Sequence, residues 1–406
     1  MKCLRFVAVL ALLLTFVTAG FCEDWPQFRG VNRDGRSPEK GLLKVWPQEG
    51  PKLLWANEEL GFGYASPSIV EGTVFTSGSE GSQGFVYAIA PSGKLKWKKE
   101  YGPEWTNQHP GARTTPTFDE GKLYIMSGMG KLVCLDAATG DEKWSLDAVA
   151  QYKGKIPSWG VAESPLVVGD KVICTPGGSE ASVIAVDKNS GKVLWTTKDL
   201  SEMSAYCSPI LVPTSGSPIL VTMLAYCVVG IVPETGEVLW RQEHKTRYDI
   251  HAVSPVFDEG YLYITSGYGA GGEMFKLSSD GRQATRLWTD KNLDCHHGGV
   301  VSVGGCIYGS NYGGTLVCLA EKDGRVMFQD KGVGKGSVIC ADGMLYCYSE
   351  RGTLGLVKAA PEKYELAGSF NITKGDREHW AHPAISDGKL YIRHGAVLMV
   401  YDIKQK

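Results

Sequence analysis

The chain has 406 residues, of which 43% are hydrophobic and 21% are charged, and these shares exclude a largely disordered protein. Its 51 glycines favour an all-β protein with many tight turns over a helical one. With 42 Lys and Arg against 44 Asp and Glu, the formal net charge is −2 and no block of like charges occurs, so we expect no nucleic-acid partner.

The first 22 residues have the pattern of a secretory signal. Two cations precede an apolar run over residues 6–14, and small residues follow it. The run is shorter than a membrane-spanning helix needs and no later apolar stretch approaches that length, so we expect no transmembrane segment. Cys22 raises the question of a lipid anchor, but Phe21 stands where a small residue normally precedes a lipidated cysteine, so we expect none. We therefore expect an exported chain, periplasmic or extracellular, with residues 23–406 as its mature part.

The cysteines do not have the spacing of a disulfide framework. Cys3 and Cys22 belong to the signal, which leaves nine of the eleven. Most of the nine lie in strand-like runs such as residues 133–135 and 317–319, and no C-x-x-C or adjacent pair occurs. This pattern predicts buried free thiols that behave as small hydrophobic residues.

One sequence unit recurs along the whole mature chain. Its fullest copy begins at Ser164-Pro165, passes through a Gly-rich loop and ends in Trp195. An aromatic residue marks the end of each copy, and the marks are about 40–50 residues apart, a spacing typical of repeat architectures. The marks are Trp55, Trp97, Trp144, Trp195, Trp240, Trp288, Phe328 and Phe370.

Each unit contains four short alternating apolar runs joined by Gly-rich turns, which predicts a four-stranded antiparallel sheet. One such sheet cannot bury both of its faces, and radial stacking in a β-propeller solves this problem. The last unit, residues 382–403, has only three runs, and Lys52–Trp55 supplies the missing outer strand. The sequence therefore predicts an all-β, eight-bladed β-propeller, formed as one domain by residues 23–406 and closed by its N-terminal strand.

The antiparallel path also predicts which segments share a face. If the strand after each Ser-Pro pair is innermost, the first and third turns of every unit lie on one face. The second loops, the connections between blades and the starts of the inner strands lie on the other. That second face carries the long and unusual loops, and we expect the binding site there.

The unit Val133–Gly140, followed by Trp144, resembles the tryptophan-docking repeat of the pyrroloquinoline-quinone (PQQ) propeller superfamily. That superfamily comprises quinoprotein alcohol dehydrogenases and cofactor-free relatives such as the propeller lipoprotein of the outer-membrane assembly machine. The resemblance covers essentially residues 23–406. The chain is also similar to an uncharacterised exported subgroup of PQQ-like propellers, through residues 24–30, 248–255, 334–337, 349–352 and 379–383.

The resemblance implies specific chemistry only in part. Quinoprotein dehydrogenases hold PQQ over a floor Trp, coordinate Ca²⁺ through carboxylates, use an Asp base and carry a disulfide between adjacent cysteines. Arg113 matches a cofactor-binding arginine, Gly177–Glu180 resembles the segment that supplies a calcium ligand, and Asp249 stands like the catalytic Asp. The adjacent cysteines and the haem motif C-x-x-C-H do not occur in the sequence. PQQ and Ca²⁺ therefore stay open as cofactors, and neither is required.

The histidines are the most informative polar residues. Six of the eight fall at or shortly before a predicted inner strand, at positions 109, 251, 296, 297, 379 and 382. Taken singly, each is best explained by a hydrogen bond between blades. Together, polar groups that converge in a concavity favour a binding funnel. The ligand-binding residues that we expect there are Tyr64, Arg113, Glu163, Tyr206, Asp249, His251, His297, Lys335, His379, Trp380 and His382.

Three chemistries compete within that funnel. A transition metal has weak candidate ligands in Glu180, His251 and His296, and adjacent histidines on a strand point to opposite sides, so only one of His296 and His297 should face a given site. Asp249 is a candidate catalytic base, but no nucleophile–base pair is apparent. The third option is stacking on sugar rings, for which the candidate aromatic residues are Tyr64, Trp105, Trp159, Tyr206 and Trp380.

One further motif, the Gly-rich segment 267–272, resembles a dinucleotide-binding loop. It joins two predicted strands, and no helix follows it to hold a phosphate.

Two functions follow from these features. The first is an exported, monomeric binding module that holds a polar, saccharide-like ligand or an envelope protein partner at the channel mouth. The second is a quinoprotein-type dehydrogenase that oxidises alcohols or sugars with PQQ and Ca²⁺. The sequence leaves open whether the chain is an enzyme, and it does not name the ligand.

Overall fold

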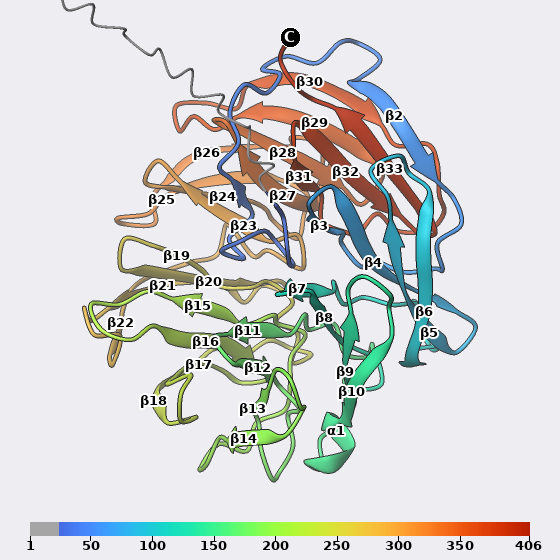
Figure 1. Cartoon of the computed structure of the whole chain (residues 1–406). Helices are drawn as coiled ribbons and strands as arrows, with labels where there is room; N and C mark the ends of the chain where they lie inside the picture. The colour runs from blue at the N-terminus through green and yellow to red at the C-terminus, as the bar shows by residue number, and fades with distance from the viewer. Residues whose placement is uncertain (1–23) are drawn as a thin grey trace, which may run out of the picture.

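The computed structural model describes residues 24–406, so the predicted signal, with Cys3 and Cys22, lies outside the described residues. The described chain is almost entirely β structure, and its one helix, α1 (Ala148–Gln151), has four residues. Its strands form eight sheets arranged in a ring, each with four antiparallel strands, and one sheet has a short fifth strand, β1 (Arg36–Ser37), which is parallel to its neighbour (Figure 1). The predicted eight-bladed β-propeller is confirmed.

The blades follow one another along the chain, with the innermost strand first. Blades 1 to 4 consist of β3 (Ser68–Val70), β4 (Thr73–Glu80), β5 (Gln83–Ile89), β6 (Leu95–Pro103); β7 (Thr117–Asp119), β8 (Lys122–Met126), β9 (Lys131–Asp136), β10 (Glu142–Asp147); β11 (Leu166–Val168), β12 (Lys171–Cys174), β13 (Ile184–Asp187), β14 (Val193–Thr196); and β15 (Ile210–Val212), β16 (Ile219–Leu224), β17 (Cys227–Ile231), β18 (Val238–Glu243).

The second half of the ring also includes the two N-terminal strands. Blades 5 to 8 consist of β19 (Val256–Asp258), β20 (Tyr261–Ser266), β21 (Gly271–Leu277), β22 (Ala284–Asp290); β23 (Val300–Val303), β24 (Cys306–Ser310), β25 (Leu316–Ala320), β26 (Val326–Asp330); β27 (Gly336–Ala341), β28 (Met344–Ser349), β29 (Thr353–Lys358), β30 (Leu366–Asn371), with β1 (Arg36–Ser37); and β31 (Ala384–Ser386), β32 (Lys389–His394), β33 (Val397–Asp402), with β2 (Lys52–Asn57).

Tryptophans on the outer strands connect neighbouring blades. The indole of Trp195 donates to the carbonyl oxygen of Pro233 in the next blade at 2.7 Å. Beneath that ring Gly236 has φ +78°, and a Cβ at this glycine would lie 2.5 Å from Trp195. The same kind of indole hydrogen bond leads from Trp55, Trp97, Trp144, Trp240 and Trp288 to the following blade. These contacts are the physical basis of the aromatic end mark in each repeat.

The N-terminal strand closes the ring, as the sequence predicted. Strand β2 pairs antiparallel with β33, with Trp55 opposite Val400. Gly50, just before β2, lies under the ring of Phe370 from blade 7, where a Cβ would approach within 2.5 Å. In the other blades the third and fourth strands are joined by a turn of continuous chain. In blade 8 these two strands come from opposite ends of the chain, and Gly50 takes the place of the turn glycine.

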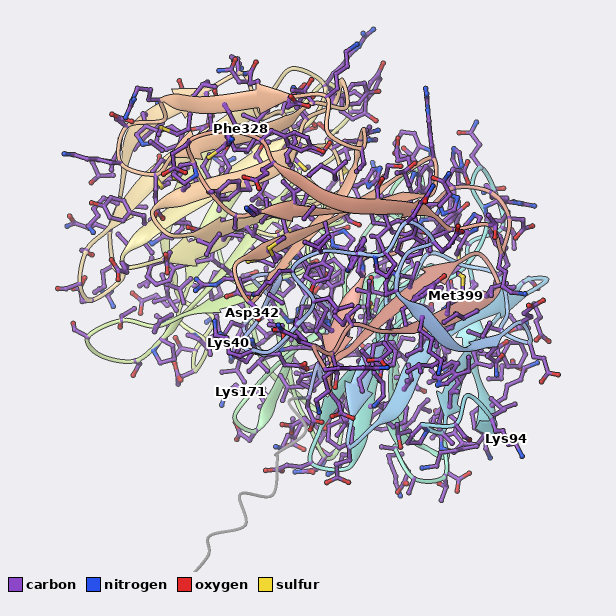
Figure 2. The ribbon with its side chains drawn as sticks, turned by 90° about the horizontal axis from the view of Figure 1, so that it is seen from above. Lys40, Lys94, Lys171, Phe328, Asp342 and Met399 are labelled. Atoms are coloured by element: carbon purple, nitrogen blue, oxygen red, sulfur yellow. The ribbon has the colours of Figure 1, made fainter. Side chains whose placement is uncertain are left out.

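The segment between β1 and β2 follows blade 7 outward. Asp342 lies beside Lys40, as Figure 2 shows from above. Its carboxylate pairs with Lys44 at 2.7 Å and accepts from the backbone N–H of Leu42 at 3.1 Å. This route carries the chain from the centre of the ring to its outer edge.

Residues 24–37, hereafter the N-terminal segment, lie against the inner strands of the ring (Figure 1). Two arginines of this segment are each 1% exposed. Arg33 donates to the carbonyl oxygens of Ser164, Pro165 and Pro209 and to the hydroxyl of Thr117. These four acceptors belong to blades 2, 3 and 4 or to the residues that lead into them.

Arg29 makes the equivalent contacts on the opposite side of the ring. It donates to the carbonyl oxygens of Val300 and Val338 at 2.5 and 3.4 Å, and to Nδ1 of His382 at 3.3 Å. Trp25 bridges to Ile69 of blade 1, and Arg36 pairs with Asp258 of blade 5 at 3.6 Å. The N-terminal segment therefore contacts all eight blades.

The hydrophobic core lies between the blades. The five residues of the central strand β17 are all buried, whereas the outer strand β18 is partly exposed. All nine described cysteines are buried and free, as their placement in strand-like runs predicted. Among residues 24–406, no helix has the length and apolar character needed to cross a membrane.

Candidate functional site

A cavity of about 310 Å³, the mouth cavity, lies on the face where the blade connections converge. Ring-bearing side chains and small polar residues form most of its wall. The lining residues are Phe28, Tyr64, Ser66, His109, Arg113, Trp159, Ala162, Tyr206, Ser208, Ile250, Ala252, Tyr268, His296, His297, Trp380 and His382. Phe28 comes from the N-terminal segment, and its ring lies 5.0 Å from that of His382.

A simple positional rule relates this wall to the fold. In seven blades, the fourth residue before the inner strand lines the mouth cavity. These residues are Tyr64, Arg113, Ala162, Tyr206, Ala252, His296 and Trp380. In each of these seven blades, the residue just before the lining residue is buried, because neighbouring side chains of an extended backbone point to opposite sides. His251 and His379 occupy this buried position.

Trp380 lies at the centre of an aromatic cluster. Its ring centroid is 4.8 Å from those of Tyr64 and His109 and 5.6 Å from that of His297. On another part of the wall, Trp159 and Tyr206 lie 6.3 Å apart. The cavity thus offers several ring faces to a ligand.

Arg113 is the one arginine or lysine among the described residues that line the cavity. Its guanidinium donates to the backbone oxygens of His109 and Gly111 and lies 5.4 Å from the ring of Tyr64. Burial lowers its pKa, against the raising influence of Tyr64, but an arginine stays charged at neutral pH. The side chain is therefore a fixed positive group at the wall.

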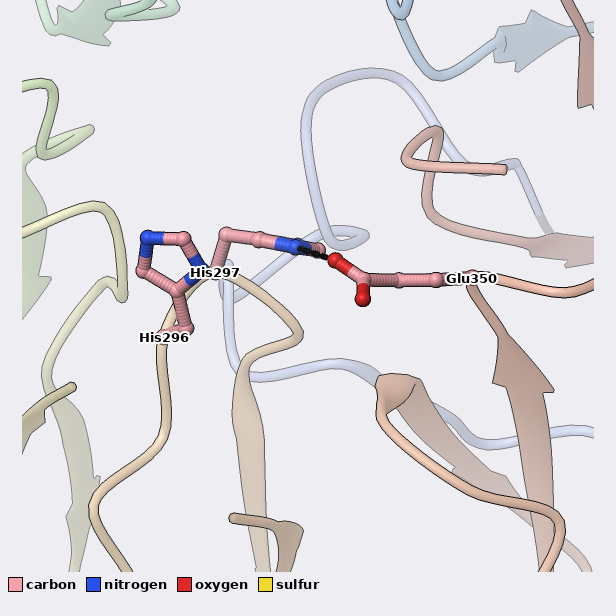
Figure 3. Close-up of side chains that lie close together, drawn as sticks. All are labelled: His296, His297 and Glu350. Atoms are coloured by element: carbon pink, nitrogen blue, oxygen red, sulfur yellow. Dashed lines mark hydrogen bonds and ion pairs between the residues drawn. The ribbon is translucent and has the colours of Figure 1, made fainter. Parts of the chain in front are cut away.

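Glu350 contacts three of the expected site residues, and Figure 3 shows its contact with His297. Its Oε1 accepts from Nε2 of His297 at 2.6 Å, from the indole of Trp380 at 3.0 Å and from Nζ of Lys335 at 3.1 Å. Burial acts to raise the pKa of Glu350, but His297 and Lys335 lower it to about 2. An ionised carboxylate thus holds the orientation of Trp380 and His297.

The same region contains a group of metal-type ligand atoms. Those of His296, His297 and Glu350 all lie within 4.8 Å of one another. The two histidine rings are 4.9 Å apart, so the expectation that only one could face a given site was wrong. The physical reason is that both lie in the loop before β23, not on a strand.

The ammonium group of Lys335 lies where a metal ion bound by this group would contact His296 and Glu350. Its Nζ lies 2.9 Å from Nδ1 of His296 and 3.1 Å from Oε1 of Glu350. Burial lowers the pKa of His296 to about 3, so the ring is neutral and its Nδ1 accepts from the ammonium. Glu180, the other carboxylate considered for a metal, pairs with Lys153 at 2.6 Å, away from these histidines.

Two expected site histidines lie inside the blades and not in the cavity wall. His251 is 0% exposed; its Nδ1 lies 2.7 Å from the Ser266 hydroxyl and its Nε2 3.0 Å from the Ala225 carbonyl oxygen. His379 contacts the hydroxyl of Tyr348 at 2.5 Å and stacks on another buried histidine. Burial lowers the pKa of His251 to about 3 and of His379 to about 4. Both residues have the contacts of interblade hydrogen-bonding groups.

Two expected acidic residues also lie outside the lining. The Glu163 carboxyl is 2% exposed and accepts from the backbone N–H and the hydroxyl of Thr175. Asp249 has a positive φ of 56° and accepts from the hydroxyl of Tyr226 at 3.4 Å. Neither carboxylate borders the mouth cavity.

His382 connects the wall to the N-terminal segment. Its Nε2 donates to the backbone oxygen of His297 at 2.9 Å, so its Nδ1 accepts from Arg29. Burial and the Arg29 charge lower the pKa of His382 to about 3, which agrees with a neutral ring. His297 is therefore held from two sides, by Glu350 and by His382.

Several lining residues escaped the sequence reasoning. Phe28 lies in a segment outside the repeats, and Ala162 and Ala252 carry no reactive group. Tyr268 lies in the Gly-rich segment 267–272, which does join two strands, β20 and β21. The repeat register would have found the two alanines, since they occupy the same position as Tyr64 and Arg113.

The described residues do not fit a calcium-bound PQQ. No carboxylate is present among the residues that line the cavity, although Ca²⁺ requires oxygen ligands, commonly carboxylates. Asp249 and Glu180, the residues that the resemblance suggested, both lie elsewhere.

Known proteins resemble this chain in two groups. Quinohemoprotein alcohol dehydrogenase ADH-IIG of Pseudomonas putida is 32% identical over 142 residues, which cover 32% of this chain and 19% of that protein. Outer membrane protein assembly factor BamB of Yersinia pestis is 23% identical over 269 residues, 63% of each chain. The alignments thus span less than two thirds of either relative.

Solved structures show the same architecture. BamB from Moraxella catarrhalis superposes with a TM-score of 0.64 at 16% identity, covering 87% of this chain and 98% of that one. Quinohemoprotein alcohol dehydrogenase from Comamonas testosteroni superposes with a TM-score of 0.67 at 14% identity, covering 95% and 81%. At these identities the likeness establishes the fold alone.

The family match agrees with the repeats and the ring. Residues 82–330 match the family described as outer membrane protein assembly factor BamB. With the eight blades, the docking tryptophans and the dehydrogenase relatives, this match assigns the chain to the PQQ-like β-propeller family.

Proposed function

We propose that this propeller is a binding module whose mouth cavity holds a polar, ring-shaped ligand of the saccharide class. The observation that carries the proposal is the aromatic cluster around Trp380, held in place by Glu350. Aromatic faces bury the apolar faces of a sugar ring, while Arg113, His109 and Ser208 can bond its hydroxyls. Such binding needs no metal and no redox cofactor.

The signal pattern of residues 1–22 supports a location outside the cytoplasm, in the periplasm or the extracellular space. The name of one relative, outer membrane protein assembly factor, supports an envelope protein as an alternative partner at the same face. Loops on a rigid scaffold can serve either kind of ligand.

The second candidate is a quinoprotein-type dehydrogenase, which the names of several relatives favour. The cavity wall supplies Arg113 for an anionic cofactor but no carboxylate for Ca²⁺. We therefore place binding ahead of catalysis.

Trp380→Ala tests the proposal. A panel of neutral and acidic saccharides is screened against the whole chain by thermal shift, and the affinity of the best binder is measured by calorimetry. We expect the substitution to weaken that binding at least about tenfold, equal to about 1.4 kcal/mol, because the central stacking face is lost.

Tyr261→Ala is the matched control, since this partly exposed aromatic residue lies at the first turn of blade 5, outside the cavity. It should leave affinity unchanged. If no saccharide binds, or if both variants bind equally well, the saccharide proposal fails. Alcohol oxidation that depends on added PQQ and Ca²⁺ would establish the dehydrogenase instead.

A further inference from the structure

A second concavity, the side groove, lies on blades 4 and 5. Its volume is about 670 Å³, within the range of about 300–1,000 Å³ that is common for ligand sites. One wall is the end of β18 with the following residues, and the other consists of the loop after β20 and parts of β21 and β22. The lining residues are Arg241, Gln242, Glu243, His244, Lys245, Thr246, Arg247, Tyr268, Gly269, Ala270, Glu273, Arg286 and Lys291. Tyr268 also lines the mouth cavity, so the two sites are neighbours.

The side groove is positively charged, although the chain as a whole has a net charge of −2. Five of its lining residues are Lys or Arg and two are Glu, which gives +5 − 2 = +3. All five cationic residues are exposed. A local excess of this sign attracts anionic ligands.

His244, a lining residue of the side groove that is 4% exposed, has both ring nitrogens in hydrogen bonds within the protein. The carbonyl of Ala225 can only accept, so Nε2 of His251 donates to it and Nδ1 of this neutral ring accepts from the Ser266 hydroxyl. The Ser266 oxygen then accepts from Nε2 of His244 at 3.2 Å. The carboxylate of Glu273 accepts from Nδ1 of His244 at 2.7 Å. The His244 ring is thus held by Ser266 and Glu273, and neither of its nitrogens is free for a ligand of the side groove.

This order of hydrogen bonds also excludes a hydrolytic triad. Ser266, His244 and Glu273 have the sequence of contacts that a serine hydrolase uses. The hydroxyl proton of Ser266, however, points to His251 and not to His244, and Ser266 is 0% exposed. The chain of contacts therefore activates no nucleophile.

The acidic residues of the side groove are already paired. Glu273 binds His244 and, at 3.0 Å, Arg286, while Glu243 pairs with Lys245 at 3.5 Å. Arg247 and Lys291 have no carboxylate partner within the described part of the chain. Arg247 lies over the ring of Tyr248, and Lys291 donates to the carbonyl oxygens of Gly269 and Ala270.

We infer that the side groove binds an acidic peptide segment of a protein partner. The positive groups come from both walls of the groove, three from the end of β18 and the residues after it and two from β22 and the residue after it. A chain that bears several carboxylates matches such a distribution, and arginine binds carboxylates in this groove already. Gln242 and Thr246 supply uncharged groups that can bond the peptide backbone.

The probe is a fluorescein-labelled hexaglutamate peptide, with hexaglutamine as its uncharged counterpart, and binding to the whole chain is followed by fluorescence anisotropy. We expect hexaglutamate to bind, hexaglutamine to bind at least tenfold more weakly, and affinity to fall as salt is raised. The double variant Arg247→Ala, Lys291→Ala should weaken hexaglutamate binding at least tenfold. Both side chains are exposed, so we expect the fold to be retained.

The control Arg325→Ala, Lys94→Ala removes the same two residue types from exposed positions outside the side groove, and it should change affinity less than twofold. Trp380→Ala should leave hexaglutamate binding intact, which separates this site from the mouth cavity. Equal losses in the two double variants, or no binding by the unaltered chain, would overturn the inference. Tripolyphosphate that binds at the groove while hexaglutamate does not would overturn the peptide assignment as well.

Discussion

Glu163 is a carboxyl group held at the interface of blades 3 and 4, close to Arg33 and with Thr175 as its hydrogen-bond donor. Burial raises its pKa from 4.5 to about 8, more than Thr175 and Arg33 lower it. The folded protein therefore keeps a proton there that the unfolded chain loses above pH 4.5. The stability that this proton contributes is complete below pH 4.5 and is lost as pH rises toward 8.

Glu163→Gln should remove this pH dependence, because the amide has the shape of the protonated acid and no proton to lose. Between pH 5 and pH 8 the unaltered protein should lose up to about 1.4 kcal/mol per pH unit through this residue. Urea unfolding at pH 5 and pH 8 should show that the unfolding free energy falls less between these two pH values in the variant than in the unaltered protein. The exposed Glu49→Gln is the control, and a variant that follows the same pH profile as the unaltered chain would contradict the assignment.

At the scale of single residues, the sequence predicted the wall of the mouth cavity only in part. Tyr64, Arg113, Tyr206 and Trp380 line the mouth cavity, whereas His251 stands one residue earlier in its blade and points into the protein. The chemistry of a residue type does not reveal this difference, since a buried histidine and a ligand-binding histidine are the same residue. Only the register of the inner strand decides which side faces the axis.

At the scale of the strand and its turn, the docking of tryptophan onto glycine explains why the repeat could be found in the sequence. The indole needs a flat backbone surface beneath it, and only glycine leaves that surface free and accepts the positive φ of the turn. The signal is therefore local and periodic, and it specified the number of blades and their strands. Loops carry no such period, which is why the joint orientation of His296 and His297 was missed.

Gly236→Ala should destabilise the protein more than Gly121→Ala does. The two glycines have φ of +78° and +76°, so the backbone penalty, about 1–2 kcal/mol, should be the same. A Cβ at Gly236 meets Trp195 at 2.5 Å, whereas nothing lies within 4 Å of one at Gly121. The clash should add about 1–3 kcal/mol to the loss in unfolding free energy, measured by urea denaturation. Equal losses would show that the tryptophan moves without cost.

At the scale of the whole molecule, the ring is closed twice. The outer closure is the pairing of β2 with β33, which the missing strand of the last repeat predicted. The inner closure is the N-terminal segment, whose contacts with all eight blades lie at the axis. This inner closure could not be predicted, because the segment lies outside the repeats and no periodicity assigns it a place. It also supplies Phe28 to the mouth cavity, so the fold and the site share one element.

Arg33→Met should therefore destabilise the ring as a whole. The substitution keeps much of the side-chain volume but leaves the carbonyl oxygens of Ser164, Pro165 and Pro209 without the guanidinium that bonds them. Each buried polar group left unsatisfied costs about 1–3 kcal/mol, so the unfolding free energy should fall by about 3 kcal/mol or more.

Arg36→Met is the matched control within the same segment, because its ion pair with Asp258 is partly exposed, with side-chain exposures of 41% and 30%. Surface ion pairs contribute about 0–1 kcal/mol, so this variant should unfold at nearly the same urea concentration as the unaltered protein. If Arg33→Met lost no more stability than Arg36→Met, the blades would be held by their own interfaces, and the N-terminal segment would only fill the space between them. The alternative outcome is a cooperative unfolding transition that moves to a lower urea concentration only in Arg33→Met. It would show that the stability of three blades depends on one guanidinium at the axis, because Arg33 bonds to blades 2, 3 and 4.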